Sequence, residues 1–288
     1  MNSQKTIEQT ATIIPARREF LKLTSIVMGA ALGGLLLPSV ASAAPVPQKR
    51  VLSMNNSSTQ KTILIIGASR GLGHAMAAEF VTKGWHVIGT VRGKDRTLLH
   101  DLSDKNPGCV EIEHLEVTDL EQIKALRKRL SNRGLDILFH NAGTANKNQS
   151  ETIAEVSTEE FTQVMVTNAL SPMRVIECLQ DLVPASGTIG IMSSGQGSVS
   201  SNTNGGHEVY RGTKAALNMY MRSYAARHAG EQRTLLLMAP GWVRTELGGP
   251  EAPLSIEQSI PKVVNVILSQ QGKPGLQYLD REGKTVPW

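Results

Sequence analysis

Residues 61–73 read Lys-Thr-Ile-Leu-Ile-Ile-Gly-Ala-Ser-Arg-Gly-Leu-Gly, and this stretch decides the fold. Thr62–Ile66 is a short apolar run, which predicts a strand buried on both faces. A turn with the glycine spacing G-x-x-x-G-x-G follows, and His74–Lys83 is a helix-forming run that stops at Gly84. Glycines let a backbone approach phosphates, and a helix N-terminus attracts anions. The stretch therefore predicts a dinucleotide cradle, although such a turn also occurs without any ligand.

Apolar runs and helix-forming runs alternate from this stretch onward. The predicted strands span residues 62–66, 85–91, 109–117, 135–139, 187–192, 233–238 and 276–279. The predicted helices span residues 74–83, a segment before 109, 120–130, 157–183 with a bend near Ser171-Pro172, 210–228 and 256–268. This alternation predicts an α/β fold of the Rossmann type: a doubly wound parallel sheet of about seven strands, with helices on both faces. Ligands of such sheets bind at the carboxyl ends of the strands, where the strand order reverses.

Composition narrows the class of protein. The 288 residues are 40% hydrophobic, which is enough for one large core, and we expect residues 61–288 to form a single catalytic domain. The net charge is +5, of which residues 1–43 carry +2, so the remaining positive charge is too small and scattered for a nucleic-acid surface. The two cysteines, Cys109 and Cys178, form no C-x-x-C pair, and we predict two buried thiols and no metal site.

The first 43 residues have the features of an export signal. Residues 16–22, Ala-Arg-Arg-Glu-Phe-Leu-Lys, resemble the twin-arginine motif except at the first position. A weakly apolar stretch too short to span a bilayer follows, and then the small residues 41–43 that suit cleavage. We predict a twin-arginine signal peptide over 1–43, a flexible linker over 44–60 and a periplasmic protein with no stable membrane anchor after cleavage. The alternative is a cytoplasmic protein whose leader is not used, for which Met54 would be an ordinary start.

Tyr210 and Lys214 are candidates for proton transfer. They stand at positions i and i+4, so they share one face of the predicted helix. A free tyrosine has a pKa of about 10, and a nearby ammonium group is expected to lower it. Tyr210 could then act as a general acid or base near neutral pH. Taken alone, the pair could equally be a surface contact.

Polar residues also follow the central strands. Ser193 and Ser194 end the fifth predicted strand, where a hydroxyl could hold a substrate oxygen, and Asn141-Ala142-Gly143 ends the fourth. Asn168 lies within a predicted helix, although asparagine is a mediocre helix former and needs a partner when buried. The structural alternatives are ordinary turns at the two strand ends.

Taken in order, these motifs resemble those of the short-chain dehydrogenase/reductase family from about Lys61 to the end of the sequence. The matching segments are Gly67-Ala68-Ser69-Arg70-Gly71-Leu72-Gly73, Asn141-Ala142-Gly143, the set Asn168, Ser194, Tyr210 and Lys214, and Pro240-Gly241-Trp242-Val243-Arg244-Thr245. The interval of 16 residues from Ser194 to Tyr210 is longer than is usual in the family. Together with Gly241-Trp242-Val243, it resembles the C-factor and sniffer-like carbonyl reductases.

The resemblance implies an oxidoreductase that interconverts a carbonyl and an alcohol, with the hydride supplied or taken by a nicotinamide. It assigns the substrate proton to Tyr210, a hydrogen bond to the same substrate oxygen to Ser194, the cofactor ribose to Lys214 and a bound water to Asn168. The substrate would be a small carbonyl or alcohol, held between residues 195–209 and 247–255. The alternative is a C-factor-like signalling or binding protein that keeps the nucleotide fold with little or no turnover.

The resemblance also implies a set of cofactor contacts. They fall on Gly67, Ser69, Arg70, Gly71, Leu72, Gly73, Arg92, Val117, Asn141, Ala142, Gly143, Tyr210, Lys214, Pro240, Gly241, Val243 and Thr245. The sequence departs from the family at Glu116, where an aspartate is usual, and the longer side chain puts a hydrogen bond to adenine there in question.

Charge around the second strand bears on which nicotinamide is bound. No acid follows that strand before Asp95, whereas Arg92 ends it and Arg70 lies in the glycine turn. Two arginines near the adenosine ribose favour NADP(H), because a 2′-phosphate needs cations. If both are solvated surface charges, NAD(H) remains possible. The long helices 157–183 and 210–228 resemble those that pair subunits in this family, so we expect a homodimer or homotetramer.

Overall fold

The computed structural model describes residues 60–288. The predicted signal peptide and the predicted linker up to residue 59 lie outside the described residues. Seven strands form one sheet: β1 (Thr62–Ile66), β2 (His86–Val91), β3 (Val110–His114), β4 (Ile137–His140), β5 (Thr188–Met192), β6 (Thr234–Ala239) and β7 (Gly275–Asp280). All neighbouring strands are parallel, in the order β3-β2-β1-β4-β5-β6-β7. The Rossmann-type sheet predicted from the sequence is confirmed.

The strand order reverses beside β1, the strand that leads into the glycine turn. Ile63 of β1 pairs with Val87 of β2 on one side and with Ile137 of β4 on the other. The chain therefore builds one half of the sheet outward through β2 and β3, and the other half outward from β4. Because the βα turns after β1 and β4 diverge from this point, a crevice opens at the carboxyl ends of these two strands.

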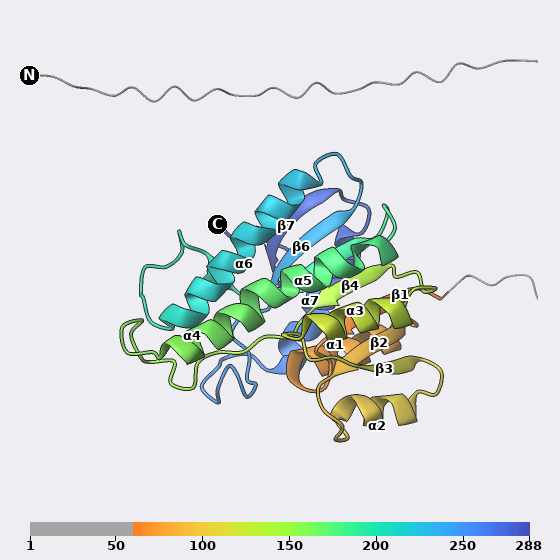
Figure 1. The fold of residues 1–288 in the computed structure, drawn as a ribbon, viewed down its shortest axis with the longest axis horizontal. Helices are drawn as coiled ribbons and strands as arrows, with labels where there is room; N and C mark the ends of the chain where they lie inside the picture. The colour runs from red at the N-terminus through yellow and green to blue at the C-terminus, as the bar shows by residue number, and fades with distance from the viewer. Residues whose placement is uncertain (1–59) are drawn as a thin grey trace, which may run out of the picture. The chain divides into compact units, whose positions relative to one another are not determined.

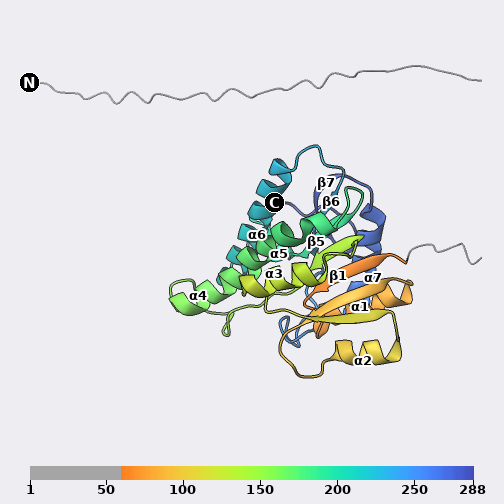
Figure 2. The ribbon, with the colours of Figure 1, turned by 45° about the vertical axis from the view of Figure 1, so that its right-hand side comes forward.

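Helices cover both faces of the sheet. They are α1 (Gly71–Thr82), α2 (Leu98–Lys105), α3 (Leu120–Arg129), α4 (Thr158–Met165), α5 (Ser171–Leu179), α6 (Glu208–Arg227) and α7 (Ile256–Gln270). One core cluster joins the sheet to α3, α5 and α6, and a second joins it to α1, α2 and α7. Figure 1 shows α3, α5 and α6 in front of the sheet, and Figure 2 shows the same layers after a turn.

The predicted helix over 157–183 is one rod interrupted once. Its first part is α4 and its second part is α5, and a π-helical segment, Val166–Leu170, lies between them. Pro172 follows at the start of α5, where a proline is tolerated because the first-turn N–H groups need no intrahelical acceptor. The predicted bend is therefore a π segment just before the proline, and Asn168 lies at its centre.

Several other boundaries differ from the sequence prediction by one to three residues, and two of them differ by three. Helix α1 begins at Gly71, three residues before the expected start, because the N–H of His74 already donates to the Arg70 carbonyl at 3.3 Å. Strand β3 ends at His114, since the residues up to Val117 leave the sheet. Within residues 60–288, no helix combines the length and the apolar character needed to cross a bilayer.

Candidate active site

The glycine turn after β1 is held by its neighbours on both sides. From the β2 side, Thr90 accepts the N–H of Gly67 on its hydroxyl at 2.8 Å and the N–H of Ala68 on its carbonyl at 2.8 Å. From the β4 side, the Asn141 amide donates to the Gly67 carbonyl at 2.8 Å. A Cβ on Gly73 would lie 2.0 Å from the Gly67 carbonyl oxygen, so no larger residue fits there. The turn is thus packed tightly against both strands.

The start of α1 has the features of an anion site. Its N-cap, Arg70, makes no side-chain cap hydrogen bond, and the first turn carries no acidic residue. Gly71 has a φ of +56° with open space around it, so the backbone there is accessible from outside. Free N–H groups together with the positive end of the helix dipole fit a diphosphate. The predicted contacts Ser69 and Leu72 lie in this same turn, both half-buried.

Asn141-Ala142-Gly143 joins the glycine turn to the predicted catalytic tetrad, which consists of Asn168, Ser194, Tyr210 and Lys214. The N–H groups of Asn141 and Ala142 both donate to the Ile66 carbonyl at 2.9 Å, which fixes the end of β4 to the end of β1. A Cβ on Gly143 would lie 3.4 Å from Asn168 Oδ1 and 3.6 Å from Lys214 Nζ. The motif predicted on the cofactor side therefore touches two of the four predicted catalytic residues.

Ser194, Tyr210 and Lys214 come together at the end of β5. The Ser194 side chain lies near enough to the Tyr210 hydroxyl to have a lowering effect on its pKa, and the Ser194 hydroxyl accepts the N–H of Gln196 at 3.2 Å. Lys214 Nζ lies 5.7 Å from the Tyr210 ring centre and donates to the Met192 carbonyl at 2.9 Å. Only one of the two predicted serines faces Tyr210, because the neighbouring Ser193 is buried and its hydroxyl donates to Asn218 instead.

The pKa of Tyr210 moves opposite to the sequence expectation. Burial raises the pKa of Tyr210 to about 12, and the nearby Ser194 side chain acts against this rise. Burial also lowers the pKa of Lys214 to about 8. The expected lowering by the ammonium group is wrong for this arrangement, since desolvation of both groups outweighs an interaction across 5.7 Å. Tyr210 is therefore protonated at neutral pH, as a proton donor to an alkoxide must be.

Asn168 is buried, and its side chain makes three hydrogen bonds. Its Oδ1 accepts the N–H of Thr144 at 2.8 Å, and its Nδ2 donates to the Thr144 carbonyl at 2.7 Å and to the Thr213 hydroxyl at 3.0 Å. Thr213 in turn donates to the Tyr210 carbonyl at 2.8 Å. The side chain thus ties the loop after β4 to the helix that carries Tyr210. A bound water would have two acceptors available: the second lone pair of Asn168 Oδ1, and the backbone of the π segment, where the regular hydrogen-bond pattern is broken.

The two arginines expected near the adenosine ribose each face a carboxylate. A guanidinium nitrogen of Arg70 lies 3.2 Å from a carboxylate oxygen of Glu246. A guanidinium nitrogen of Arg92 lies 3.7 Å from a carboxylate oxygen of Glu116. Both guanidinium groups are exposed. The other oxygen of Glu116 accepts the N–H and the hydroxyl of Thr118 at 3.1 and 3.0 Å, so this carboxylate is turned back on its own loop. Val117, between them, is buried in the core.

The segment after β6 folds back upon itself. Ser259 donates to the Pro240 carbonyl at 2.7 Å, and Val243 pairs with Leu254 in an isolated parallel bridge. Gly241 has a φ of +87°, and a Cβ there would meet Leu254 at 2.6 Å. Thr245 accepts the N–H of Gly248 at 3.0 Å. These contacts hold the predicted cofactor residues of this segment in one compact turn.

Three residues at the site were not predicted. Thr90 holds the glycine turn and gave no signal in the sequence beyond its place at the end of a strand. His140 precedes Asn141, is fully buried, and has no hydrogen-bond partner at either ring nitrogen among the described residues. Asn218 could have been found, because it stands four residues after Lys214 on the same helix face. Within residues 60–288, no three acidic, histidine or cysteine side chains gather as a metal site.

The motifs and the sheet order together identify the family. The sequence profile described as enoyl-(acyl carrier protein) reductase matches residues 67–262, which is most of the chain. The chain belongs to the short-chain dehydrogenase/reductase family. It is an oxidoreductase of that family, as the sequence analysis expected.

Three relatives show the breadth of this short-chain dehydrogenase/reductase group. A short-chain dehydrogenase/reductase from Burkholderia multivorans with bound NADP is 60% identical, with a TM-score of 0.79 over 80% of this chain and 100% of that one. The carbonyl reductase Sniffer of D. melanogaster is 28% identical, with a TM-score of 0.71 over the same shares. The C-signal of Myxococcus xanthus is 32% identical over 54% of this chain and 93% of its own. Both predicted subgroups are therefore among the relatives.

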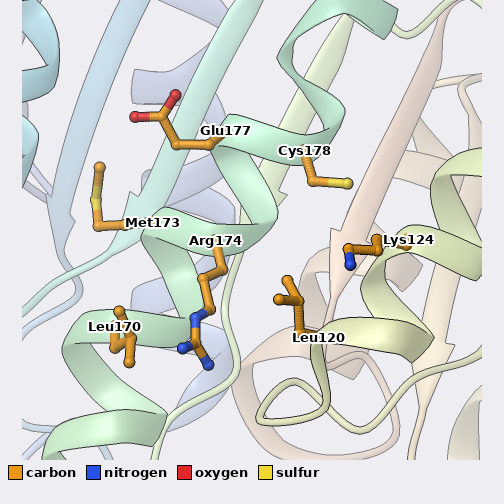
Figure 3. Close-up of a pocket in the computed structure, with 7 residues that line it drawn as sticks. All are labelled: Leu120, Lys124, Leu170, Met173, Arg174, Glu177 and Cys178. Carbon is orange, nitrogen blue, oxygen red and sulfur yellow. The ribbon is translucent and has the colours of Figure 1, made fainter.

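Two hollows lie away from the tetrad. A groove of about 450 Å³ runs between α3 and α5, and Figure 3 shows Leu120, Leu170, Met173 and Cys178 along it. A second hollow, of about 540 Å³, lies at the amino ends of the strands beside His86. Neither is at the carboxyl edge of the sheet, so neither belongs to the candidate active site.

Proposed function

We propose that this short-chain dehydrogenase/reductase is an NADP(H)-dependent enzyme that interconverts a carbonyl and an alcohol. One observation carries the proposal: Ser194, Tyr210 and Lys214 meet beside an uncapped helix N-terminus at the carboxyl edge of the sheet. A nicotinamide bound there supplies or accepts the hydride. Tyr210 gives its proton to the substrate oxygen, Ser194 orients that oxygen, and Lys214 holds the ribose hydroxyls.

The preference for NADP(H) rests on Arg70 and Arg92. Each is paired only with an exposed or half-exposed carboxylate, and such pairs contribute roughly 0–1 kcal/mol. A 2′-phosphate, with more charge and more acceptor oxygens, can replace the carboxylate as partner. The NADP bound to the Burkholderia relative agrees with this assignment. The Glu116 carboxylate would then no longer pair with Arg92. It would also make no hydrogen bond to adenine, a contact that the family places at this position.

The rim beside Tyr210 supports an apolar carbonyl substrate. Ile153 is exposed and donates its N–H to Glu208 at 2.7 Å, which places it at the start of α6. Gln149 contacts the Leu247 carbonyl at 3.4 Å and the His207 ring at 3.1 Å, so exposed Leu247 reaches the same place. Exposed apolar side chains grouped around a site favour an apolar ligand over a charged one. An aromatic aldehyde is therefore a suitable first substrate.

The test begins with calorimetric titration of the full chain with NADPH and with NADH. We expect tighter binding of NADPH, and Arg92→Gln is expected to weaken NADPH binding about tenfold while leaving NADH unchanged. Equal loss for both cofactors would contradict the 2′-phosphate assignment. Turnover of 4-nitrobenzaldehyde is then followed by NADPH absorbance. Tyr210→Phe is expected to abolish turnover and to keep NADPH binding.

The second candidate is a signalling or binding role, which the likeness to the C-signal favours. Such a protein would keep the nucleotide site and would not depend on a proton donor at Tyr210. A biological activity that survives Tyr210→Phe would support this candidate. The complete tetrad argues for catalysis, because binding alone has no use for all four side chains.

We propose that the protein forms a homodimer or homotetramer through the outer faces of α5 and α6. Leu170 and Met173 line the groove between α3 and α5, and Met219 and Tyr220 are exposed on α6. Light scattering after gel filtration measures the assembly. Leu170→Glu is expected to shift it toward monomer, and a monomeric wild-type protein would contradict the proposal.

We propose export to the periplasm by the twin-arginine route, with the cytoplasm as the alternative. The support is the motif around Arg17 and Arg18 and the small residues at 41–43. Replacing both arginines by lysine is expected to move the protein from the periplasmic to the cytoplasmic fraction. An unchanged distribution would favour the cytoplasmic alternative.

A further inference from the structure

The residues after β7 turn back toward the active site. Asp280 donates its N–H to the Lys284 carbonyl at 2.8 Å, and Val286 donates to the Tyr278 carbonyl at 2.9 Å. An isolated antiparallel bridge joins Leu279 to Thr285. The chain beyond the turn therefore runs back along β7, and it carries Trp288 to the loop that follows β5.

Trp288 contacts that loop with its backbone and β7 with its ring. Its carbonyl oxygen accepts the N–H of Ser200 at 2.9 Å and the Ser200 hydroxyl at 2.8 Å. Its ring centre lies 5.2 Å from that of Tyr278, and the Arg222 guanidinium carbon lies 4.7 Å from the same Trp288 ring centre. Aromatic and cation–π contacts at these distances hold the ring in one place. Trp288 thus bridges the Tyr278 side chain and the active-site loop.

Tyr278 contacts the active-site loop at Ser194. Its ring is buried, and its hydroxyl donates to the backbone carbonyl of Ser194. Asn218 holds the same loop from α6, since its Nδ2 donates to the Gly197 carbonyl at 3.2 Å and its Oδ1 accepts the Ser193 hydroxyl at 2.7 Å. The loop around Ser194 is therefore fixed by side chains from two other elements.

The turn after Ser194 has few local contacts besides hydrogen bonds from backbone N–H groups, in which the Ser194 carbonyl accepts the N–H of Gly197 at 2.9 Å and the Ser194 hydroxyl accepts the N–H of Gln196 at 3.2 Å. Gly195 and Gly197 follow Ser194, so two of its next three residues offer no side chain for packing. The direction of the Ser194 hydroxyl depends on its χ1 rotamer and on the orientation of its backbone, which fixes the Cα–Cβ bond. A hydrogen bond to the Ser194 carbonyl restricts that orientation.

We propose that Tyr278 is a positioning residue of the reaction: its hydroxyl sets the direction of the Ser194 hydroxyl toward Tyr210, and Trp288 holds the Tyr278 ring. The inference rests on the proposed role of Ser194 in orienting the substrate oxygen. It assigns a function to β7, which carries none of the residues predicted from the sequence. Groups aimed at a reacting atom must be held closely, because small displacements cost large factors in rate.

The test is a double-mutant cycle with Tyr278→Phe and Ser194→Ala. Turnover of 4-nitrobenzaldehyde with NADPH gives kcat and KM, and calorimetry gives the Kd of NADPH. Tyr278→Phe is expected to lower kcat about tenfold and to leave the NADPH Kd within about twofold. In the Ser194→Ala background, the same change is expected to alter kcat less than about twofold, because a residue that acts through Ser194 has nothing left to position.

The matched control is Tyr224→Phe. Tyr224 is as buried as Tyr278, and its hydroxyl donates to Gln180 at 2.5 Å, so the change removes a tyrosine hydrogen bond that does not touch the serine. Its kcat is expected to stay within about twofold of wild type. An equal loss in Tyr224→Phe would show a general effect of stability and overturn the proposal.

A second variant covers the case in which Tyr278→Phe does not fold. Trp288→Ala is expected to lower kcat about threefold, and Trp288→Phe, which keeps an aromatic ring on Tyr278, is expected to restore most of it. If the loss of kcat in Tyr278→Phe or in Trp288→Ala is as large in the Ser194→Ala background as in wild type, the proposal is overturned. If Ser194→Ala alone leaves kcat unchanged, the role of Ser194 in the proposed function is wrong, and that result is distinct from additivity.

Discussion

His140 should make the protein sensitive to mild acid. Its ring is fully buried, and neither ring nitrogen has a hydrogen-bond partner among the described residues. Burial first, and the charge of Lys214 second, lower the pKa of His140 to about 3, against about 6.5 for a free histidine. Between these two values the unfolded chain binds a proton that the folded chain does not. The free energy of unfolding therefore falls as the pH falls through this window.

The size of the effect follows from the two pKa values. Each pH unit below 6.5 costs about 1.4 kcal/mol, so His140 should remove about 2 kcal/mol at pH 5 relative to neutral pH. His140→Leu removes the titrating group and keeps a buried side chain. We expect wild type to lose about 2 kcal/mol more than this variant between pH 7.5 and pH 5, because other titrating groups contribute to both proteins.

Urea unfolding followed by tryptophan fluorescence at the two pH values measures the difference. His114→Asn is the control, since His114 is exposed and its ring remains in contact with water in the folded protein. A Lys214→Met variant should lose less free energy of unfolding than wild type between pH 7.5 and pH 5, because it lacks the second cause of the low pKa of His140. Equal acid losses in wild type and His140→Leu would refute the reasoning.

Three further predictions concern the cofactor site and α6. Burial lowers the pKa of Lys214 to about 8, so its ammonium is lost above that pH; the Kd of NADPH should rise about tenfold per pH unit there by calorimetry, and a Lys214→Met variant should show no such slope. Gly73→Ala should abolish NADPH binding and lower the midpoint of thermal unfolding, because its Cβ would lie 2.0 Å from the Gly67 carbonyl oxygen; normal binding by this variant would contradict the packing argument. Gly212→Ala should instead stabilise α6 by about 0.5–1 kcal/mol, since nothing lies within 4 Å of the added Cβ, and calorimetry should show Tm raised by about 1–4 °C rather than lowered.

Local sequence was enough for the strand and glycine pattern at the start of the domain. Thr62–Ile66 is β1 with the boundaries that its apolar run predicts. Tyr210 and Lys214 share a helix face because their spacing alone requires it once the helix forms. The parallel sheet with helices on both faces followed from the alternation of strands and helices, since parallel strands need crossover connections of one hand.

Other predictions depended on distances that no local pattern contains. The sequence placed Ser193 and Ser194 together at one strand end, and only the position of Asn218 on α6 shows that Ser193 is structural. The sign of the shift in the pKa of Tyr210 was wrong at first because desolvation depends on everything packed around the hydroxyl. The partner of Arg92, Glu116, likewise lies in a loop that follows a different strand, β3.

The sequence by itself therefore determined the family and the parallel sheet, and it singled out the four candidate tetrad residues, since these depend on short-range patterns in chain order. Tertiary structure alone decided how the tetrad is held. The hydrogen bond from Tyr278 to Ser194 joins residues 84 positions apart, and Trp288 reaches Ser200 across 88. Such contacts are set by where the strands lie in the sheet, because a hydrogen bond depends on distance and angle in space and leaves no periodic trace along the chain.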